Sequence, residues 1–139
     1  MIKYRVLAVL MLSVTAADAE DKIDYFKNET VESCYSKPMS QAVQGCMEDL
    51  SNKKQTEYER EFNNFLNKII SSNSSFNNFA DFHHSVLAAK KSWDDFIKNE
   101  CMAIAQLDIK GSYAYQSDYS ACLVKGYQQR IIYYKAYQL

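Results

Sequence analysis

A predicted turn at Gly111 separates Cys101 from Cys122, and the sequence on both sides of this turn has the periodicity of an α-helix. Apolar and aromatic residues recur there at steps of three and four, which places them on one helical face. They are Phe79, Phe82, Val86, Ala89, Trp93, Phe96 and Ile104 before the turn, and Tyr119, Leu123, Tyr127, Ile131 and Tyr134 after it. Gly111 lies near the midpoint between the cysteines, where two helices could reverse direction. A bond between Cys101 and Cys122 would therefore lock an antiparallel helical hairpin.

The hairpin predicts which side chains lie level with each other. Trp93 lies eight residues before the first of these cysteines, and Arg130 lies eight residues after the second. At about 1.5 Å rise per residue, each lies roughly 12 Å from the crosslink and on the same side of it. We expect the guanidinium group of Arg130 to contact the Trp93 ring. A buried arginine also needs an anion or a carbonyl, so we expect a partner such as Asp94 or Glu100.

The N-terminus has the pattern of a targeting segment. A positively charged start and an apolar run over 6–15, too short to cross a membrane, precede small residues at Ala17 and Ala19. This pattern predicts a cleavable signal peptide over residues 1–19 and a single exported, soluble domain over residues 20–139. No later apolar run is long enough to predict a transmembrane helix.

The chain has four cysteines, an even number in a small chain that is predicted to be exported. In an oxidising compartment this number predicts two disulfides, and four cysteines allow three pairings. Sequence alone does not choose among them. Proximity in the sequence and the hairpin argument favour Cys34–Cys46 together with Cys101–Cys122. The wider of these two loops would stabilise the fold by about 3 kcal/mol in the chain-entropy model.

The remaining sequence also reads as helical, since the whole chain has one proline and three glycines. We predict an all-α fold, a small antiparallel bundle of three long helices plus short N-terminal helices, pinned by two disulfides. The expected elements are a short helix within 20–33, another that begins near Pro38, and long helices over about 47–71, 77–107 and from about 113 to near the C-terminus. An Asn77 or Asn78 cap begins the second long helix, and residues 108–112 form the turn.

Several residues could carry chemistry, each with a simpler structural interpretation. His83 and His84 are adjacent, so on a helix they point about 100° apart and would not chelate one metal well. Asp94, Asp95 and Glu100 could act in general acid–base catalysis on a sugar, or could belong to a solvated helical face. The 16 basic and 17 acidic residues give no support to nucleic-acid binding. We predict no metal and no cofactor.

Tyrosines are abundant near the C-terminus, and they cannot all face a small core. Exposed tyrosine is typical of recognition surfaces, because its ring buries apolar area while its hydroxyl forms hydrogen bonds. The candidate binding residues are Tyr113, Tyr115, Tyr133 and Tyr137.

The spacing of the cysteines and their neighbours resembles that of the LprI-like lysozyme-inhibitor family, small exported bacterial helical domains. That family has a tryptophan eight residues before a cysteine with an aromatic residue between them, then Cys-Leu with an arginine eight residues after the cysteine. The matching residues are Trp93, Phe96, Cys101, Cys122, Leu123 and Arg130. The family usually has glutamine and arginine near the tryptophan, at places where this chain has Lys90, Lys91 and Ile97. The likeness covers about residues 34–134.

The resemblance implies a periplasmic or secreted protein that binds and inhibits a peptidoglycan-degrading enzyme, with Trp93, Phe96, Leu123, Arg130 and the cysteines as scaffold. The partner would be a protein, either a host lysozyme or a bacterial toxin, and the toxin case would make this chain an immunity protein. We do not expect an enzyme. Two alternatives remain open: a cell-wall enzyme that uses Asp94, Asp95 or Glu100, and a structural envelope protein that assembles through its surface tyrosines.

Overall fold

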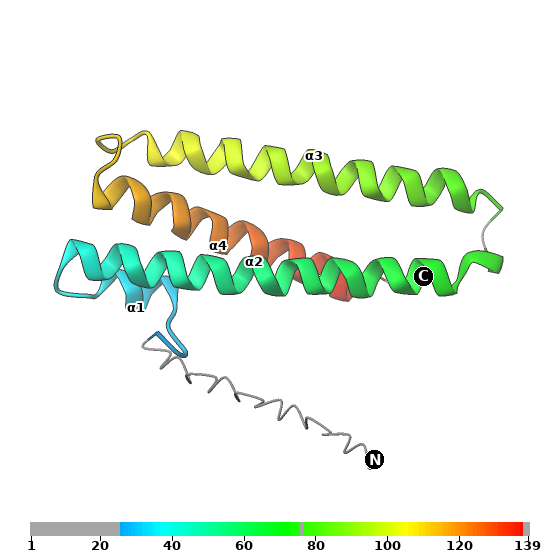
Figure 1. The fold of residues 1–139 in the computed structure, drawn as a ribbon, viewed down its shortest axis with the longest axis horizontal. Coiled ribbons are helices and arrows are strands. Elements are labelled where there is room, and N and C mark those ends of the chain that lie inside the picture. The colour runs from blue at the N-terminus through cyan, green and yellow to red at the C-terminus, as the bar shows by residue number, and fades with distance from the viewer. Residues whose placement is uncertain (1–25, 76, 138–139) are drawn as a thin grey trace, which may run out of the picture.

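The computed structural model describes residues 26–75 and 77–137, which form the helical bundle of Figure 1. Over these residues the structure is 82% helical with no strands, which confirms the predicted all-α class. None of the helices in this part of the chain combines the length and the apolar character needed to cross a bilayer. The predicted signal peptide lies outside the described residues.

The first helix, α1 (Val31–Tyr35), is short and begins at a reciprocal cap. The Thr30 hydroxyl accepts a hydrogen bond from the Ser33 amide at 3.2 Å, and the Ser33 hydroxyl accepts one from the Thr30 amide at 2.8 Å. This capping box satisfies amides that the first helical turn leaves without partners. We expected a short helix within residues 20–33, but α1 begins only at Val31, near the end of that range.

The second helix, α2 (Ser40–Ser71), is a single element of 32 residues, about 48 Å long. We expected two helices here, a short one from Pro38 to Cys46 and a long one from Met47. The structure joins them, because Gly45 lies within the helix and does not interrupt it. Pro38 instead lies in the loop that separates α1 from α2. Its missing N–H and fixed φ suit it to that position just before a helix.

A 3-10 turn, η1 (Asn73–Ser75), precedes α3 (Phe79–Ala105). Asn78 occupies the N-cap position, as predicted, but its side chain forms no capping hydrogen bond. The turn to α4 (Tyr113–Ala136) ends where the sequence predicted, but it begins at residue 106, two residues earlier than expected, because α3 ends at Ala105. Gly111 has a φ of 82°, a left-handed conformation that favours glycine, and the Ser112 hydroxyl then caps α4 by accepting from the Tyr115 amide at 3.1 Å.

Both predicted disulfides are present, which confirms the pairing. The Cα atoms are 5.5 Å apart in Cys34–Cys46 and 5.4 Å apart in Cys101–Cys122. The first joins α1 to α2, and the second joins α3 to α4. Both lie at the same end of the bundle, the end that also carries the α3–α4 turn (Figure 1).

Helix α4 lies between the other two long helices and packs against both (Figure 1). A smaller cluster beside α1 contains Val31, Cys34, Cys46, Met47, Leu50, Ala121 and Val124. The main cluster contains Tyr58, Phe62, Phe65, Ile69, Ile97, Cys101, Leu123, Tyr127, Ile131 and Tyr134. Leu123, predicted as scaffold, is therefore a core residue.

Tyr58 of α2 is the centre of the aromatic core and is fully buried. Its ring centroid lies 5.0 Å from that of Trp93 and 5.2 Å from that of Tyr127. Its hydroxyl donates a 2.6 Å hydrogen bond to Asp94, so it joins α2 to α3 through a polar contact. Burial, followed by this hydrogen bond, raises the pKa of Tyr58, which therefore stays protonated at neutral pH.

The packed face of α3 differs from the predicted one near its C-terminal end. Phe96 is 57% exposed and Ile104 is 44% exposed, although both were expected on the packed face and Phe96 as scaffold. Ile97, Cys101 and Ala105 are buried instead. Because α3 packs mainly against one helix, its contact is a narrow ridge at steps of four, and residues one position away turn toward solvent. Ile70 of α2, expected in the core, is exposed for a similar geometric reason.

Candidate functional site

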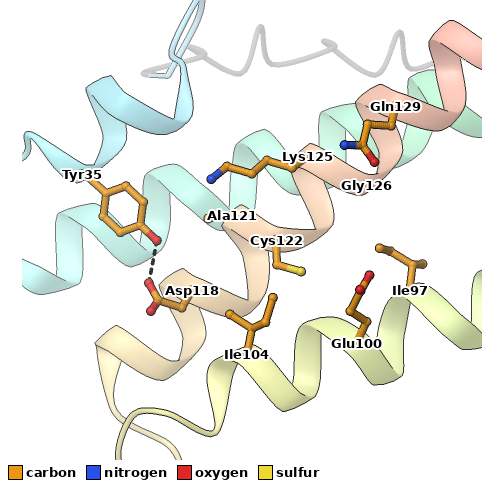
Figure 2. Close-up of a pocket in the computed structure, with 10 residues that line it drawn as sticks. All are labelled: Tyr35, Ile97, Glu100, Ile104, Asp118, Ala121, Cys122, Lys125, Gly126 and Gln129. Carbon is orange, nitrogen blue, oxygen red and sulfur yellow. Dashed lines mark hydrogen bonds between the residues drawn. The ribbon is translucent and has the colours of Figure 1, made fainter.

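A furrow of about 390 Å³ lies between α3 and α4 and reaches α1. Its lining residues, all labelled in Figure 2, are Tyr35, Ile97, Glu100, Ile104, Asp118, Ala121, Cys122, Lys125, Gly126 and Gln129. Apolar groups and the Cys101–Cys122 disulfide form part of its wall, and charged and amide groups line the rest. The furrow is open rather than enclosed, so it can hold the edge of another molecule but does not surround a substrate.

Gly126 sets the distance between the two helices at the furrow. A Cβ atom built on Gly126 would lie 2.5 Å from Cδ1 and 2.7 Å from Cγ1 of Ile97. These distances are too short for a side chain without movement of Ile97. The glycine therefore lets α3 and α4 approach closely at this point of the furrow.

Tyr35 and Asp118 close the end of the furrow near α1, as Figure 2 shows. The Tyr35 hydroxyl donates a 2.6 Å hydrogen bond to Asp118. Burial, followed by this hydrogen bond, raises the pKa of Tyr35. Desolvation and a hydrogen bond with Asp118 also raise the pKa of Asp108. Tyr35 thus remains a neutral hydrogen-bond donor at physiological pH, a structural tie between α1 and α4 rather than a nucleophile.

An apolar tip lies at the same end of the bundle, on the turn between α3 and α4. We define the apolar tip as Ile104, Leu107, Ile109 and Tyr113. Leu107 is 87% exposed and Ile109 is 84% exposed, and the other two side chains are about half exposed. Large aliphatic side chains at such exposure, grouped on one turn, make this end of the bundle a candidate contact surface.

The tip is held in one conformation by covalent and hydrogen bonds. The Cys101–Cys122 disulfide closes the base of the hairpin. Within the turn, the Asp108 amide donates to Ala105 at 3.0 Å and the Ser112 amide donates to Ile109 at 3.0 Å. The apolar tip is therefore preorganised, so that binding through it costs little conformational entropy.

Helical periodicity in the sequence did not identify Leu107 and Ile109 as surface contacts. They lie outside the helical periodicity, so no pattern assigned them to a face. The available signal was their type, because two large aliphatic residues flank Asp108 in a turn where polar residues are usual.

The three acidic residues considered for catalysis do not converge. Asp94 faces α2, where it accepts hydrogen bonds from Tyr58 at 2.6 Å and from Lys90 at 2.8 Å. Glu100 lines the furrow on another side of α3, and Asp95 is exposed. Burial alone would lower the pKa of Lys90, but its hydrogen bonds with Asp94 and Glu59 outweigh that effect and raise the pKa above its ordinary value. Lys90 therefore stays charged at neutral pH, and the ion pair with Asp94 persists. Asp94 is therefore a structural anion in this fold.

The four candidate tyrosines lie at two ends of α4. Tyr113 and Tyr115 lie in its first turn, and Tyr133 and Tyr137 lie at its C-terminal end, roughly 30 Å away at 1.5 Å per residue. Tyr113 belongs to the apolar tip, whereas the Tyr115 hydroxyl donates to the Met102 sulfur at 2.6 Å. The structure thus does not bring the four together into one surface.

The histidine and cysteine side chains do not form a plausible metal centre in the described chain. His83 is half-buried against Phe79, and His84 is exposed on the next position of α3. One group of possible ligand atoms lies within 4.8 Å, formed by Glu29, Cys34 and Cys46. Both sulfurs of that group belong to a disulfide, so they are not thiolate ligands.

The predicted register of Trp93 and Arg130 is confirmed. The guanidinium carbon lies 5.6 Å from the Trp93 ring centroid, 4.4 Å from that of Tyr133 and 5.1 Å from that of Tyr134. The expected anion or carbonyl is not there: Asp94 pairs with Lys90, and Nε of Arg130 is buried with no hydrogen-bond partner in the described structure. That part of the prediction is wrong. The Asp94 side chain points toward α2, so it does not reach Arg130, which belongs to α4.

Comparison with known proteins gives no match among protein-family models, curated proteins or solved structures. The likeness to LprI-like inhibitors therefore rests on the spacing of the residues named above.

Proposed function

We propose that this protein is an exported binding protein that inhibits a peptidoglycan-degrading enzyme, and that its apolar tip contacts that enzyme. The resemblance in sequence suggests the class of partner. The observation that carries the proposal is the exposure of Leu107 and Ile109 on a turn closed by a disulfide. Two disulfides fit an oxidising location such as the periplasm or the cell exterior.

The mechanism is steric. Lysozyme-type enzymes bind a polysaccharide in an open cleft, and a rigid convex turn is complementary in shape to such a cleft. Leu107 and Ile109 would be the central anchors, since anchors that bury large side chains carry most of the binding free energy of an interface. The furrow beside the tip would receive the rim of the enzyme, with Glu100, Asp118 and Lys125 available for polar contacts. The chain would need no chemistry of its own.

The test uses residues 20–139 with intact disulfides against a panel of lysozyme-type enzymes, with clearing of a peptidoglycan suspension as the readout. We expect Leu107→Asp and Ile109→Asp each to weaken inhibition about 10- to 100-fold, since burying such a side chain contributes about 1.5–3 kcal/mol. Ile132→Asp is the matched control, because Ile132 is 60% exposed and lies at the other end of α4.

Tip variants that inhibit as well as the wild type would refute the role of the tip. Failure of the wild type against host lysozymes and against toxins expressed in the periplasm would refute inhibition itself. Rescue of toxin-expressing cells, without effect on host lysozymes, would identify the immunity version of the proposal. Lytic activity of the purified protein alone would instead support an enzyme.

A further inference from the structure

Arg130 is a cation without an anion in the described part of the chain. Its guanidinium group lies within 6 Å of the ring centroids of Trp93, Tyr133 and Tyr134, and its Nε is buried with no hydrogen-bond partner. The rings attract the positive charge through their π-faces. They do not satisfy the buried Nε–H group, which lies in the guanidinium plane and needs an acceptor atom. Nε of Arg130 therefore lacks a hydrogen-bond acceptor among the described residues.

A small hollow of about 180 Å³ adjoins this arginine, between α3 and the C-terminal end of α4. Its lining is mostly apolar and aromatic, and among the described residues that line it Arg130 alone is charged. Phe65, Phe82, Val86 and Tyr137 form much of the wall. An apolar hollow with one convergent polar group is the usual form of a site for a small organic ligand.

The two carboxylates expected as partners of Arg130 do not serve as the missing acceptor within the described residues. Asp94 is held by Lys90 and Tyr58 on the side of α2. Glu100 lines a second hollow of about 200 Å³ that shares Arg130 and Tyr133 with the first, yet it forms no ion pair with the arginine. The acceptor that suits Arg130 is therefore external to the described chain.

We propose that the hollow binds a small carboxylic acid with an apolar tail. The carboxylate accepts charge-assisted hydrogen bonds from Arg130, and the tail packs between Phe82 of α3 and Tyr137, the residue that follows α4. A monoanion matches the single positive charge, and the size of the hollow suits a short chain or a single ring. The site lies at the end of α4 opposite the apolar tip, so this proposal is independent of enzyme inhibition.

Trp93 is the only tryptophan of the chain and lies 5.6 Å from the guanidinium carbon, so its fluorescence reports on the site. The probe is octanoate, titrated into residues 20–139 below its micelle concentration, with calorimetry as a second measurement. We expect saturable binding of octanoate, and at least about tenfold weaker binding of 1-octanol, which lacks the charge, and of acetate, which lacks the tail.

Two variants test the assignment of residues. Arg130→Gln should bind octanoate at least about tenfold more weakly, the size expected for loss of a charged hydrogen bond, while Lys110→Gln at the opposite end should bind like wild type. Because Arg130→Gln could also unfold the domain, Ala89→Phe provides a second test: it fills the hollow from α3 and leaves Arg130 in place. It should abolish octanoate binding at an unchanged helical content.

Three results would overturn the proposal. They are equal binding of octanoate and octanol, wild-type octanoate affinity in a folded Arg130→Gln or Ala89→Phe protein, and absence of saturable octanoate binding to the wild type.

Discussion

Gly126 offers a direct test of how closely α3 and α4 pack. In Gly126→Ala the new methyl group would lie 2.5 Å from Cδ1 of Ile97, so that side chain must move. Overpacking of this kind typically costs about 1–3 kcal/mol. Alanine in place of glycine inside a helix returns about 1 kcal/mol of helix propensity. We therefore expect a net change between zero and a loss of about 2 kcal/mol in the free energy of unfolding.

Gly45 supplies the matched control. It also lies inside a long helix, but a Cβ atom built on it meets nothing within 4 Å. Gly45→Ala should therefore stabilise the protein by about 0.5–1 kcal/mol, the propensity term alone. Urea denaturation with intact disulfides measures both variants. The difference between them isolates the packing cost at Gly126 and should be about 1–3 kcal/mol.

A double-mutant cycle identifies the atom responsible. Ile97→Ala alone should cost about 2–5 kcal/mol, because it leaves a cavity at a buried site. In the Gly126→Ala background it should cost at least about 1 kcal/mol less, since the added methyl group occupies part of that cavity. Additive effects, or a Gly126→Ala protein as stabilised as Gly45→Ala, would show that the helices do not approach here as described.

Three further predictions concern the core and the crosslink. Tyr58→Phe should lower the free energy of unfolding by about 1.5–3 kcal/mol in urea, since it removes a hydrogen bond to the charged Asp94; an unchanged midpoint would contradict that bond. Replacing Cys101 and Cys122 together by serine should lower the free energy of unfolding by about 3 kcal/mol. It should also speed amide hydrogen exchange over residues 106–112. Unchanged exchange there would mean that the turn is rigid without the disulfide. Burial raises the pKa of Tyr127 to about 12, whereas an unfolded tyrosine titrates near 10. Tyr127 therefore loses its proton at a lower pH in the unfolded state than in the folded state, so the free energy of unfolding should fall between about pH 10 and 12. Tyr127→Phe should make that fall less steep, and phenolate absorbance follows the titration.

Local spacing predicted the features that depend only on helix geometry. A rise of 1.5 Å per residue and a fixed crosslink were sufficient for the hairpin and the register of Trp93 with Arg130. Sequence proximity and the hairpin favoured the observed disulfide pairing among three possible ones. The turn at Gly111 followed from its conformational freedom. These features need no knowledge of which other elements pack nearby.

The errors arose where the outcome depends on tertiary packing. Periodicity identifies an apolar face but not its width, and α3 meets mainly α4, so Phe96 turned outward while Ile97 turned inward. The Asp94 side chain points toward α2 and binds Tyr58 there, so Nε of Arg130 has no carboxylate partner among the described residues. Leu107 and Ile109 lie in a turn, where no period assigns a side chain to a surface.

The placement of the two disulfides divides the chain into two covalently closed halves. One bond lies within α1–α2 and the other within α3–α4, and neither crosses the connection over residues 72–78. A protease cut in that connection would leave two oxidised fragments joined only by noncovalent contacts, chiefly the packing of α4 on α2 and the hydrogen bond from Tyr58 to Asp94. The same architecture makes the protein a natural candidate for splitting, because each half could be produced separately and reassembled without any exchange of disulfides.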